Sequence, residues 1–306
     1  MTKIVTDQLQ RRDGTEFTLP KTDGAAGQSL LTDGRGNLYF PPPTTTEAVV
    51  LPGQAFYGFG SGTYAWTCPP GVTSVCVVCI GGGAGSQSAT YTTPCGGGGL
   101  GWKNDIAVSP GKTYTVQVGR GGDYLQAESP TNGGGGTSYF IDTNTVYGGG
   151  GSFPTGGTYG GDGGGNGGSG SSYCGGGAGG YSGAGGSGGG YAGSGGGAGG
   201  GGSYSSTYGW SSGGGTGPFG QGASGVGYSY VGGGGGSGGE NGRGGENPWL
   251  SYGSGQLDGG LYGGGSGQGG NSGSAGGYQT YRGGRGCVRI IWGTGRKFPS
   301  TGTGDM

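Results

Sequence analysis

The feature that constrains this sequence most is a zone of short glycine runs between residues 149 and 285. The chain has 306 residues, 99 of which are Gly, and Ser, Asn, Asp or Pro interrupt the runs. Collagen would require Gly at every third position and abundant Pro, and neither condition is met. No stretch has the apolar period of an amphipathic α-helix. The zone is therefore either disordered or held together by its own backbone.

Backbone hydrogen bonds are the interaction that could order such a zone, because Gly has no side chain to bury and loses much conformational freedom on folding. Gly runs can form the extended threefold helix, which rises about 3.1 Å per residue and has no internal hydrogen bonds. Without Cβ atoms, neighbouring helices can approach and bond to one another. Aromatic residues recur among the runs, whereas disordered tracts are poor in them. We therefore expect a polyglycine II helix bundle; the alternative is a disordered, self-associating Gly/Tyr-rich tract.

Residues 51–148 have the pattern of an ordinary β domain. Segments rich in β-branched and aromatic residues lie next to Gly, Pro, Asp or Asn, which predicts short strands. Ser109-Pro110-Gly111 predicts a tight turn, because Pro fixes φ and Gly takes a positive φ. The expected strands are Thr63–Thr67, Val72–Ile80, Trp102–Val108, Lys112–Val118, Thr137–Ile141 and Thr145–Tyr147.

A further strand, Gly286–Trp292, follows the glycine zone. A lone strand is not stable, so we expect it to return to the sheet formed by residues 51–148. The expected fold class is therefore all-β: a small antiparallel β-sandwich with a large glycine-rich insertion and essentially no α-helix. The predicted parts are an extended attachment or oligomerisation segment (1–50), the sandwich (51–148 with 286–293), the insertion (149–285) and a C-terminal tail (294–306).

Residues 1–50 are polar and rich in turn signals, without a core pattern. Thr22-Asp23-Gly24 recurs as Thr32-Asp33-Gly34, and Asp-Gly favours a turn. Two short extended pieces joined by turns would project into solvent unless a partner held them. We therefore expect this segment to connect the protein to other copies or to a larger particle.

The composition argues against catalysis and cofactor binding. The chain has no His, the commonest general base and metal ligand. Glycine patterns that match phosphate loops lack the helix that such loops need. We therefore expect no enzyme activity, no cofactor and no metal. A net charge of −1 without a basic run predicts no nucleic-acid partner.

The sequence also predicts no membrane insertion. The longest apolar run, Val75–Ile80, is too short to span a bilayer. The first 20 residues lack the apolar core of a secretory signal peptide, so export by that route is not expected.

Six cysteines leave three interpretations. Cys76 and Cys79 have a CxxC spacing, but alternation along a strand sends them to opposite faces, which disfavours a zinc or redox site. The cysteines are either small buried thiols or participants in one or two cross-strand disulfides, as in an extracellular particle. The six are Cys68, Cys76, Cys79, Cys95, Cys174 and Cys287.

The richest candidate for surface binding is the segment Glu240–Tyr252, ENGRGGENPWLSY. Exposed aromatic rings at turns between rigid rods would form a stacking surface for sugars. Trp249 is the residue that we expect to bind, with Arg243, Glu246 and Tyr252 nearby. The alternative is that Trp249 caps the apolar end of the glycine bundle.

Several segments resemble a known family. FYGFGSGTYAWTCPPGVTSVCVVCIGGGAG, followed by PCGGGGLGWKNDIAVSPGKTYTVQVGRGG, resembles the glycine-rich domain of phage tail fibres and virion structural proteins. GCVRIIWGTGRKFPST (286–301) resembles the ending of such proteins in phages of cyanobacteria. TDGAAGQSLLTDGRGNLYF looks like a short repeat common in their fibre proteins. The glycine bundle is similar in architecture to the receptor-binding adhesin at the tip of some T-even-type fibres.

The resemblance implies a structural protein of a virion or extracellular fibre with a role in host attachment. Its expected partners are copies of itself, other virion proteins and a host cell-surface glycan. The alternative is a self-assembling extracellular filament subunit, in which the N-terminal segment of one copy adds a strand to the next copy.

Overall fold

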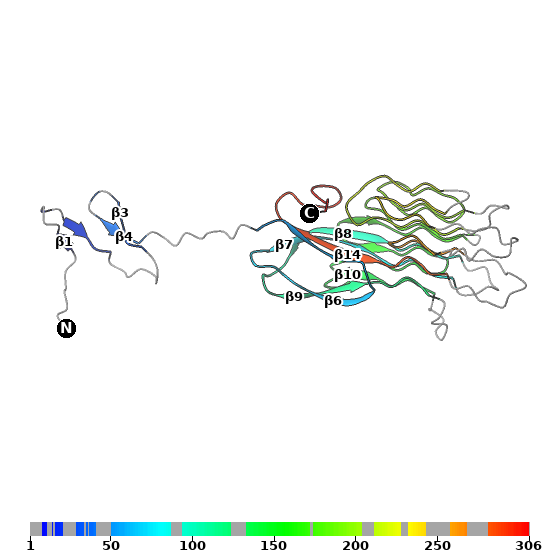
Figure 1. Ribbon diagram of the computed structural model, residues 1–306, viewed down its shortest axis with the longest axis horizontal. Coiled ribbons are helices and arrows are strands. Elements are labelled where there is room, and N and C mark those ends of the chain that lie inside the picture. Colours follow the sequence, from blue (N-terminus) through cyan, green and yellow to red (C-terminus); the bar gives the residue numbers. More distant parts are fainter. Residues whose placement is uncertain are drawn as a thin grey trace, which may run out of the picture. The chain divides into compact units, whose positions relative to one another are not determined.

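The computed structural model describes most of the chain (Figure 1). The chain separates into two compact units, Met1–Val49 and Val50–Met306. All regular secondary structure in the described residues is antiparallel β, and no helix occurs among them, which confirms the all-β prediction. The described residues are 8–10, 14, 16–20, 29–33, 35, 37–40, 50–86, 94–123, 133–171, 174–203, 211–227, 232–242, 258–267 and 281–305.

The first unit contains two two-stranded sheets, in which β1 (Gln8–Gln10) pairs with β2 (Glu16–Thr18) and β3 (Leu31–Thr32) pairs with β4 (Leu38–Tyr39). The carboxylate of Asp33 holds the turn after β3, because it accepts hydrogen bonds from the backbone N–H groups of Arg35 (2.7 Å) and Asn37 (3.1 Å). Such small sheets are marginally stable in water.

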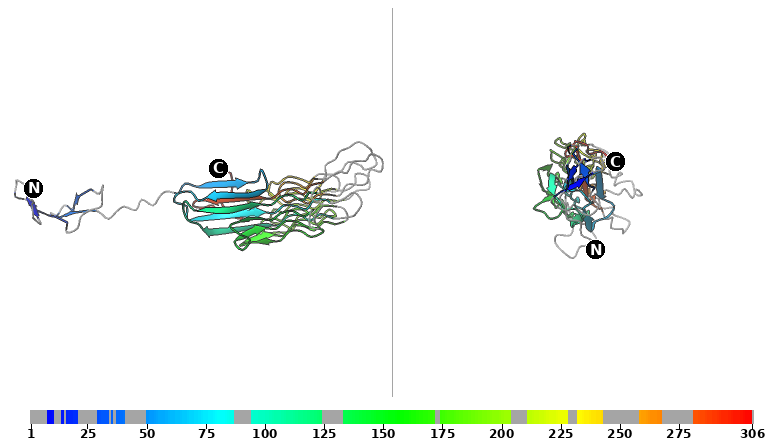
Figure 2. Two further views of the ribbon diagram at one scale, coloured as in Figure 1. Left: turned by 90° about the horizontal axis from the view of Figure 1, so that it is seen from below. Right: turned by 90° about the vertical axis from the view of Figure 1, so that its left-hand side faces the viewer.

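The second unit is built on two five-stranded sheets that pack face to face (Figure 2). One sheet has the order β12-β11-β10-β9-β6 and the other β13-β8-β7-β14-β5. The first sheet contains β6 (Gly62–Thr67), β9 (Thr113–Val118), β10 (Ser138–Phe140), β11 (Val146–Gly148) and β12 (Tyr159–Gly160). The second contains β5 (Gly53–Tyr57), β7 (Ser74–Ile80), β8 (Leu100–Ala107), β13 (Gly163–Gly165) and β14 (Cys287–Trp292).

The strands expected between residues 51 and 148 occur as β6 to β11. The expected turn also forms, with Gly111 at φ +76° and the N–H of Lys112 donating to the carbonyl of Ser109 (3.1 Å). β14 lies between β7 and β5, with Ile290 paired with Val77 on one side and Ala55 on the other. The return of this strand to the sheet is therefore confirmed.

Three strands of the second unit, β5, β12 and β13, were not predicted from the sequence. β5 has the sequence GQAFY, which lacks β-branched residues, and β12 and β13 consist mostly of Gly. Gly disfavours strands, so β12 and β13 are strands only because β11 and β8 offer them partners.

The sheet that contains β7 is buried on both faces. Val77 and Cys79 of β7 face the first core, between the two sheets, whereas Val78 and Ile80 face a second core on the other side. Tyr181 from the glycine zone and Phe298 from the C-terminal tail complete this second core. The continuous apolar run of β7 reflects this double burial.

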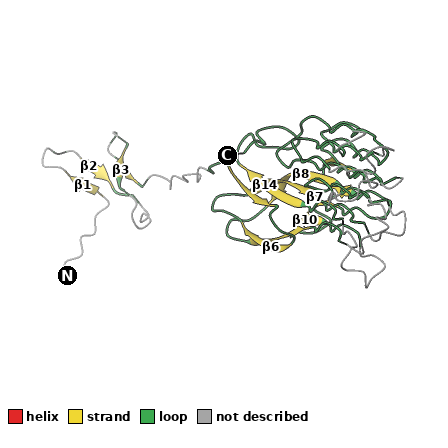
Figure 3. Ribbon diagram, turned by 45° about the vertical axis from the view of Figure 1, so that its right-hand side comes forward, coloured by secondary structure: helices red, strands yellow, loops and turns green. Residues whose placement is uncertain are grey.

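The described part of the glycine zone is ordered by backbone hydrogen bonds between extended segments, and it continues from the sandwich (Figure 3). The segment Gly81–Ser86 follows β7 directly, and residues three apart in it donate to the same neighbouring segment, at distances of 2.7–3.1 Å. A period of three is that of the threefold extended helix. The N–H groups of Gly81 and Ala84 donate to the carbonyls of Gly99 and Gly96, respectively. Those of Gly82 and Gly85 donate to Gly136 and Gly133, and those of Gly83 and Ser86 donate to Gly284 and Tyr281.

Three more segments donate to carbonyl groups of Gly81–Ser86. The N–H groups of Gly151, Gly122 and Ser266 bond to the carbonyls of Gly82, Gly83 and Ala84 at 2.8–2.9 Å. The segment is therefore surrounded by six neighbours, which is hexagonal packing. This pattern is the expected polyglycine II bundle, and we call it the glycine lattice.

The lattice requires Gly because neighbouring backbones occupy the space of a Cβ atom. A Cβ on Gly83, for example, would lie 2.1 Å from the carbonyl oxygen of Gly264. The lattice includes Gly81–Ser86, which precedes residue 149, whereas β12 and β13 of the sheets follow that residue. The sandwich and the lattice therefore each contain residues from both sides of residue 149, where the boundary between them was expected.

Candidate functional site

One end of the glycine lattice is the first candidate surface, because buried Ser and Cys side chains from several segments meet there. Ser86 lies at the end of its segment away from β7, and its N–H donates to the hydroxyl of Ser266 (2.9 Å). That hydroxyl contacts the Sγ atom of Cys95 (3.3 Å), and the N–H of Ser203 donates to the hydroxyl of Ser211 (2.7 Å). We call this layer of buried Ser and Cys side chains the distal end of the lattice.

The residues predicted to bind at a surface lie outside the described residues. The described residues on either side of that segment are Gly242 and Asp258. The hydroxyl of Ser212 donates to the carbonyl of Asp258 (2.7 Å), and Gly242 adjoins the carbonyl of the same Ser212. The segment is therefore flanked in the sequence by two residues that both lie beside Ser212. It contains the predicted binding residues Arg243, Glu246, Trp249 and Tyr252.

Charged groups lie at the rim of the distal end. Arg282 forms an ion pair with Asp123 (3.4 Å), and its N–H donates to the carboxylate of Asp258 (2.8 Å). Among the described residues, the buried charged side chains are Arg289 and Arg296, which contact the C-terminal tail. The described lattice interior therefore offers small hydroxyl and thiol groups but no charge.

All six cysteines are buried free thiols in the structure. Cys79 faces the first core and Cys76 the second, so the prediction that they point to opposite faces is confirmed. The proposed cross-strand disulfides are not formed here. In the described part of the chain, no group of three or more His, Cys, Asp or Glu residues could hold a metal ion.

Burial should make these thiols unreactive in the native protein. Desolvation raises the pKa of Cys95 to about 12 and raises the pKa of Cys287 well above its usual range. At pH 8 we expect no labelling of the native protein by DTNB within minutes, and labelling of all six thiols in guanidinium chloride. A denatured protein that titrates two thiols fewer would contradict the free-thiol state and indicate a disulfide.

The raised pKa of Cys95 makes the stability of the protein depend on pH. The thiol of Cys95 ionises near its ordinary pKa of 9.0 in the unfolded chain and only at about 12 in the native protein. Stability from this buried neutral thiol is therefore complete below pH 9 and is lost as the pH rises towards 12.

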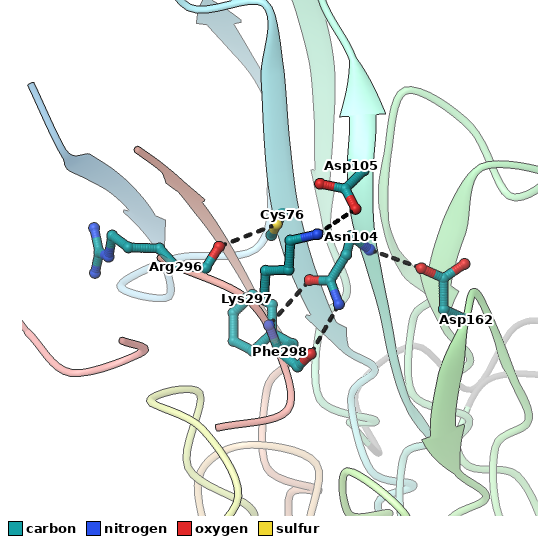
Figure 4. A network of polar contacts seen from close by, with 7 residues as sticks. All are labelled: Cys76, Asn104, Asp105, Asp162, Arg296, Lys297 and Phe298. Carbon is teal, nitrogen blue, oxygen red and sulfur yellow. Dashed lines mark hydrogen bonds and ion pairs between the residues drawn. The ribbon is translucent and has the colours of Figure 1, made fainter. Parts of the chain in front are cut away.

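The C-terminal tail is fixed to β8 by a polar network (Figure 4). The side-chain amide of Asn104 donates to the carbonyl of Phe298 (2.8 Å), and the N–H of Phe298 donates back to its oxygen (3.0 Å). Lys297 pairs with Asp105 (2.7 Å), and the thiol of Cys76 donates to the carbonyl of Arg296 (3.3 Å). This network places Phe298 in the second core, which is a structural role.

A second candidate surface lies beside β5, and we call its residues, Phe56, Phe59, Phe219, Tyr262 and Arg285, the aromatic patch. The ring of Phe56 packs against three other rings, with centroid-to-centroid distances of 5.7 Å to Phe59, 6.0 Å to Phe219 and 5.9 Å to Tyr262. The guanidinium of Arg285 donates to the carbonyl of Phe59 (3.0 Å). No local sequence signal marks this patch, because its members come from four distant segments.

Comparison with known proteins is consistent with the glycine content. The family model of a glycine-rich domain matches residues 59–293, from the turn after β5 to the end of β14. A comparison with curated proteins found no match. No helix in the described part of the chain has the length and apolarity needed to cross a membrane.

Proposed function

The chain belongs to the family of glycine-rich domains, and from this premise we propose that it is a structural subunit of an extracellular fibre. Within that class, we propose a phage tail fibre or virion appendage protein that takes part in attachment to the host surface. Its partners would be copies of itself, other virion proteins and a host glycan. The role requires no catalysis.

The observation that carries this proposal is the glycine lattice. Its backbone groups are bonded to neighbouring segments, and six neighbours surround Gly81–Ser86. Such a lattice should be rigid and resistant to proteases, because cleavage requires an extended segment to leave its neighbours. It also places Gly242 and Asp258, which flank the predicted binding residues in the sequence, beside Ser212. A rigid support for surface loops suits attachment.

The first unit supports a role in assembly. Leu30 and, on the sheet of β3 and β4, Leu31 and Tyr39 are exposed, and no described residue of this unit belongs to a buried hydrophobic core. This exposure fits contact with other subunits, and it also favours the second candidate function, a filament whose copies are linked head to tail through residues 1–50.

Electron microscopy of the pure full-length protein distinguishes the two functions. A discrete oligomer is expected for a fibre subunit with closed symmetry, and long filaments are expected for head-to-tail linkage. Deletion of residues 1–45 should abolish either assembly while the second unit stays folded. A monomeric full-length protein, or assembly that survives the deletion, would contradict the role of the first unit.

A further inference from the structure

We propose that the aromatic patch is a binding site for a carboxylated sugar residue of a surface glycan. The site lies on the second unit, beside β5, and contains none of the residues of the predicted segment Glu240–Tyr252. Binding at this patch does not depend on the fibre assignment, because it is a property of the second unit.

The aromatic rings form a fixed platform. Phe56 is anchored against the second core and contacts the three other rings at 5.7–6.0 Å. Phe59 is 83% exposed and Phe219 is 43% exposed, although both belong to this cluster. Exposed aromatic rings that are held in place lose little conformational entropy when a ligand stacks on them. The platform is therefore suited to the apolar C–H face of a sugar.

Two arginines hold the platform in different ways. The guanidinium carbon of Arg289 lies 4.6 Å from the centroid of the Phe219 ring. The Arg289 side chain is fully buried, and it donates hydrogen bonds to the carbonyls of Pro218 (3.3 Å) and Gly304 (2.8 Å). Arg289 therefore fixes Phe219 from the protein side. Arg285 fixes the main chain of Phe59 through a single hydrogen bond (3.0 Å).

The guanidinium of Arg285 retains unused hydrogen-bond donors. Its Nη1 atom donates to Phe59 and its Nε atom is buried without a partner, whereas its Nη2 atom has no hydrogen-bond or ion-pair partner among the described residues. A guanidinium group presents donors in a fixed fork that matches a carboxylate. An apolar platform beside such a fork recognises a ligand with one apolar face and one carboxylate, which describes a uronic or sialic-type sugar.

The size of the patch favours a sugar over a protein. A stable protein interface buries about 1,200–2,000 Å² of surface. Two exposed rings and one partly exposed arginine cover far less than this area. A sugar residue needs only a ring to stack on and a group that fixes its orientation. Neutral sugars would lose the contact with Arg285, and simple carboxylates would lose the platform.

Calorimetric titration of the full-length protein with oligogalacturonate tests the proposal, with the fully methyl-esterified oligomer as the neutral counterpart. We expect the acidic oligomer to bind about tenfold more tightly than the ester, and its affinity to fall with salt. Phe59→Ala and Arg285→Gln should each weaken binding about tenfold, and Arg285→Lys should weaken it less. Phe59 is exposed, so its variant should fold normally.

The controls are Leu51→Ala, which removes an exposed apolar side chain outside the patch, and Arg282→Gln, which removes an exposed arginine already paired with Asp123. Both should bind as the original protein does. Equal affinity for acid and ester, or unchanged binding by Phe59→Ala, would overturn the proposal. Absence of binding together with self-association that Phe59→Ala abolishes would also overturn it, and would identify a contact between copies.

Discussion

Gly83→Ala is expected to destabilise the protein by about 3 kcal/mol, a large part of the stability of an ordinary domain. The new Cβ atom would lie 2.1 Å from the carbonyl oxygen and 2.5 Å from the carbonyl carbon of Gly264. Both atoms belong to a backbone that is itself bonded to the lattice, since the N–H of Gly284 donates to the carbonyl of Gly264 (2.7 Å). Relief of the clash must therefore displace a whole segment. Urea unfolding followed by circular dichroism measures the loss.

Two substitutions serve as controls for this prediction. Gly304→Ala adds the same methyl group where no atom lies within 4 Å, so stability should not change. Ala84→Gly changes the next residue of the same segment, and it should cost less than about 1 kcal/mol because only chain entropy and a small buried methyl group are lost. A Gly83→Ala protein that unfolds at the original urea concentration would refute the close packing of the lattice.

Arg289→Met is expected to release the C-terminal tail and to destabilise the protein by about 3 kcal/mol. The fully buried guanidinium donates to the carbonyls of Pro218, Thr303 and Gly304 and to the side-chain oxygen of Gln54. Met has a similar length but no donor, so these buried acceptors would lose their partner. Trypsin cleavage after Arg296, which is buried in the native protein, reports release of the tail.

Arg282→Gln is the matched control for Arg289→Met. The side chain of Arg282 is 61% exposed and forms a surface ion pair, so its removal should cost less than about 1 kcal/mol and leave the tail protected. If Arg289→Met is cleaved after Arg296 no faster than the control, the tail is held by the Asn104 and Phe298 network alone.

Local sequence signals predicted strands such as β6 and β9, because these segments are rich in β-branched and aromatic residues and lie next to turn residues. β7 and β14 were found from their runs of β-branched and apolar residues, and the isolation of β14 after the glycine zone predicted its return to the sheet. β5 escaped prediction because only Phe56 and Tyr57 of its five residues favour a strand, and its pairing with β14 depends on residues more than 200 positions away.

The functional surfaces were less accessible to sequence reasoning than the fold. Phe59, Phe219 and Arg285 carry no common motif, and each belongs to a different segment. They meet because β5 and β14 pair at the edge of one sheet and because Arg289 of β14 holds the turn that carries Phe219. The predicted residues Trp249, Arg243, Glu246 and Tyr252 lie outside the described residues, so their role in binding stays a prediction.

The sequence by itself determined that this chain has a small β core and that the glycine zone must be ordered, if at all, by its backbone. Both conclusions follow from composition and periodicity, since 99 Gly residues leave little side-chain surface to bury. Only the tertiary structure decided which glycine segments are neighbours. Every Gly offers the same N–H and C=O groups, so the choice of partner depends on where the two sheets start each segment and where each segment turns back.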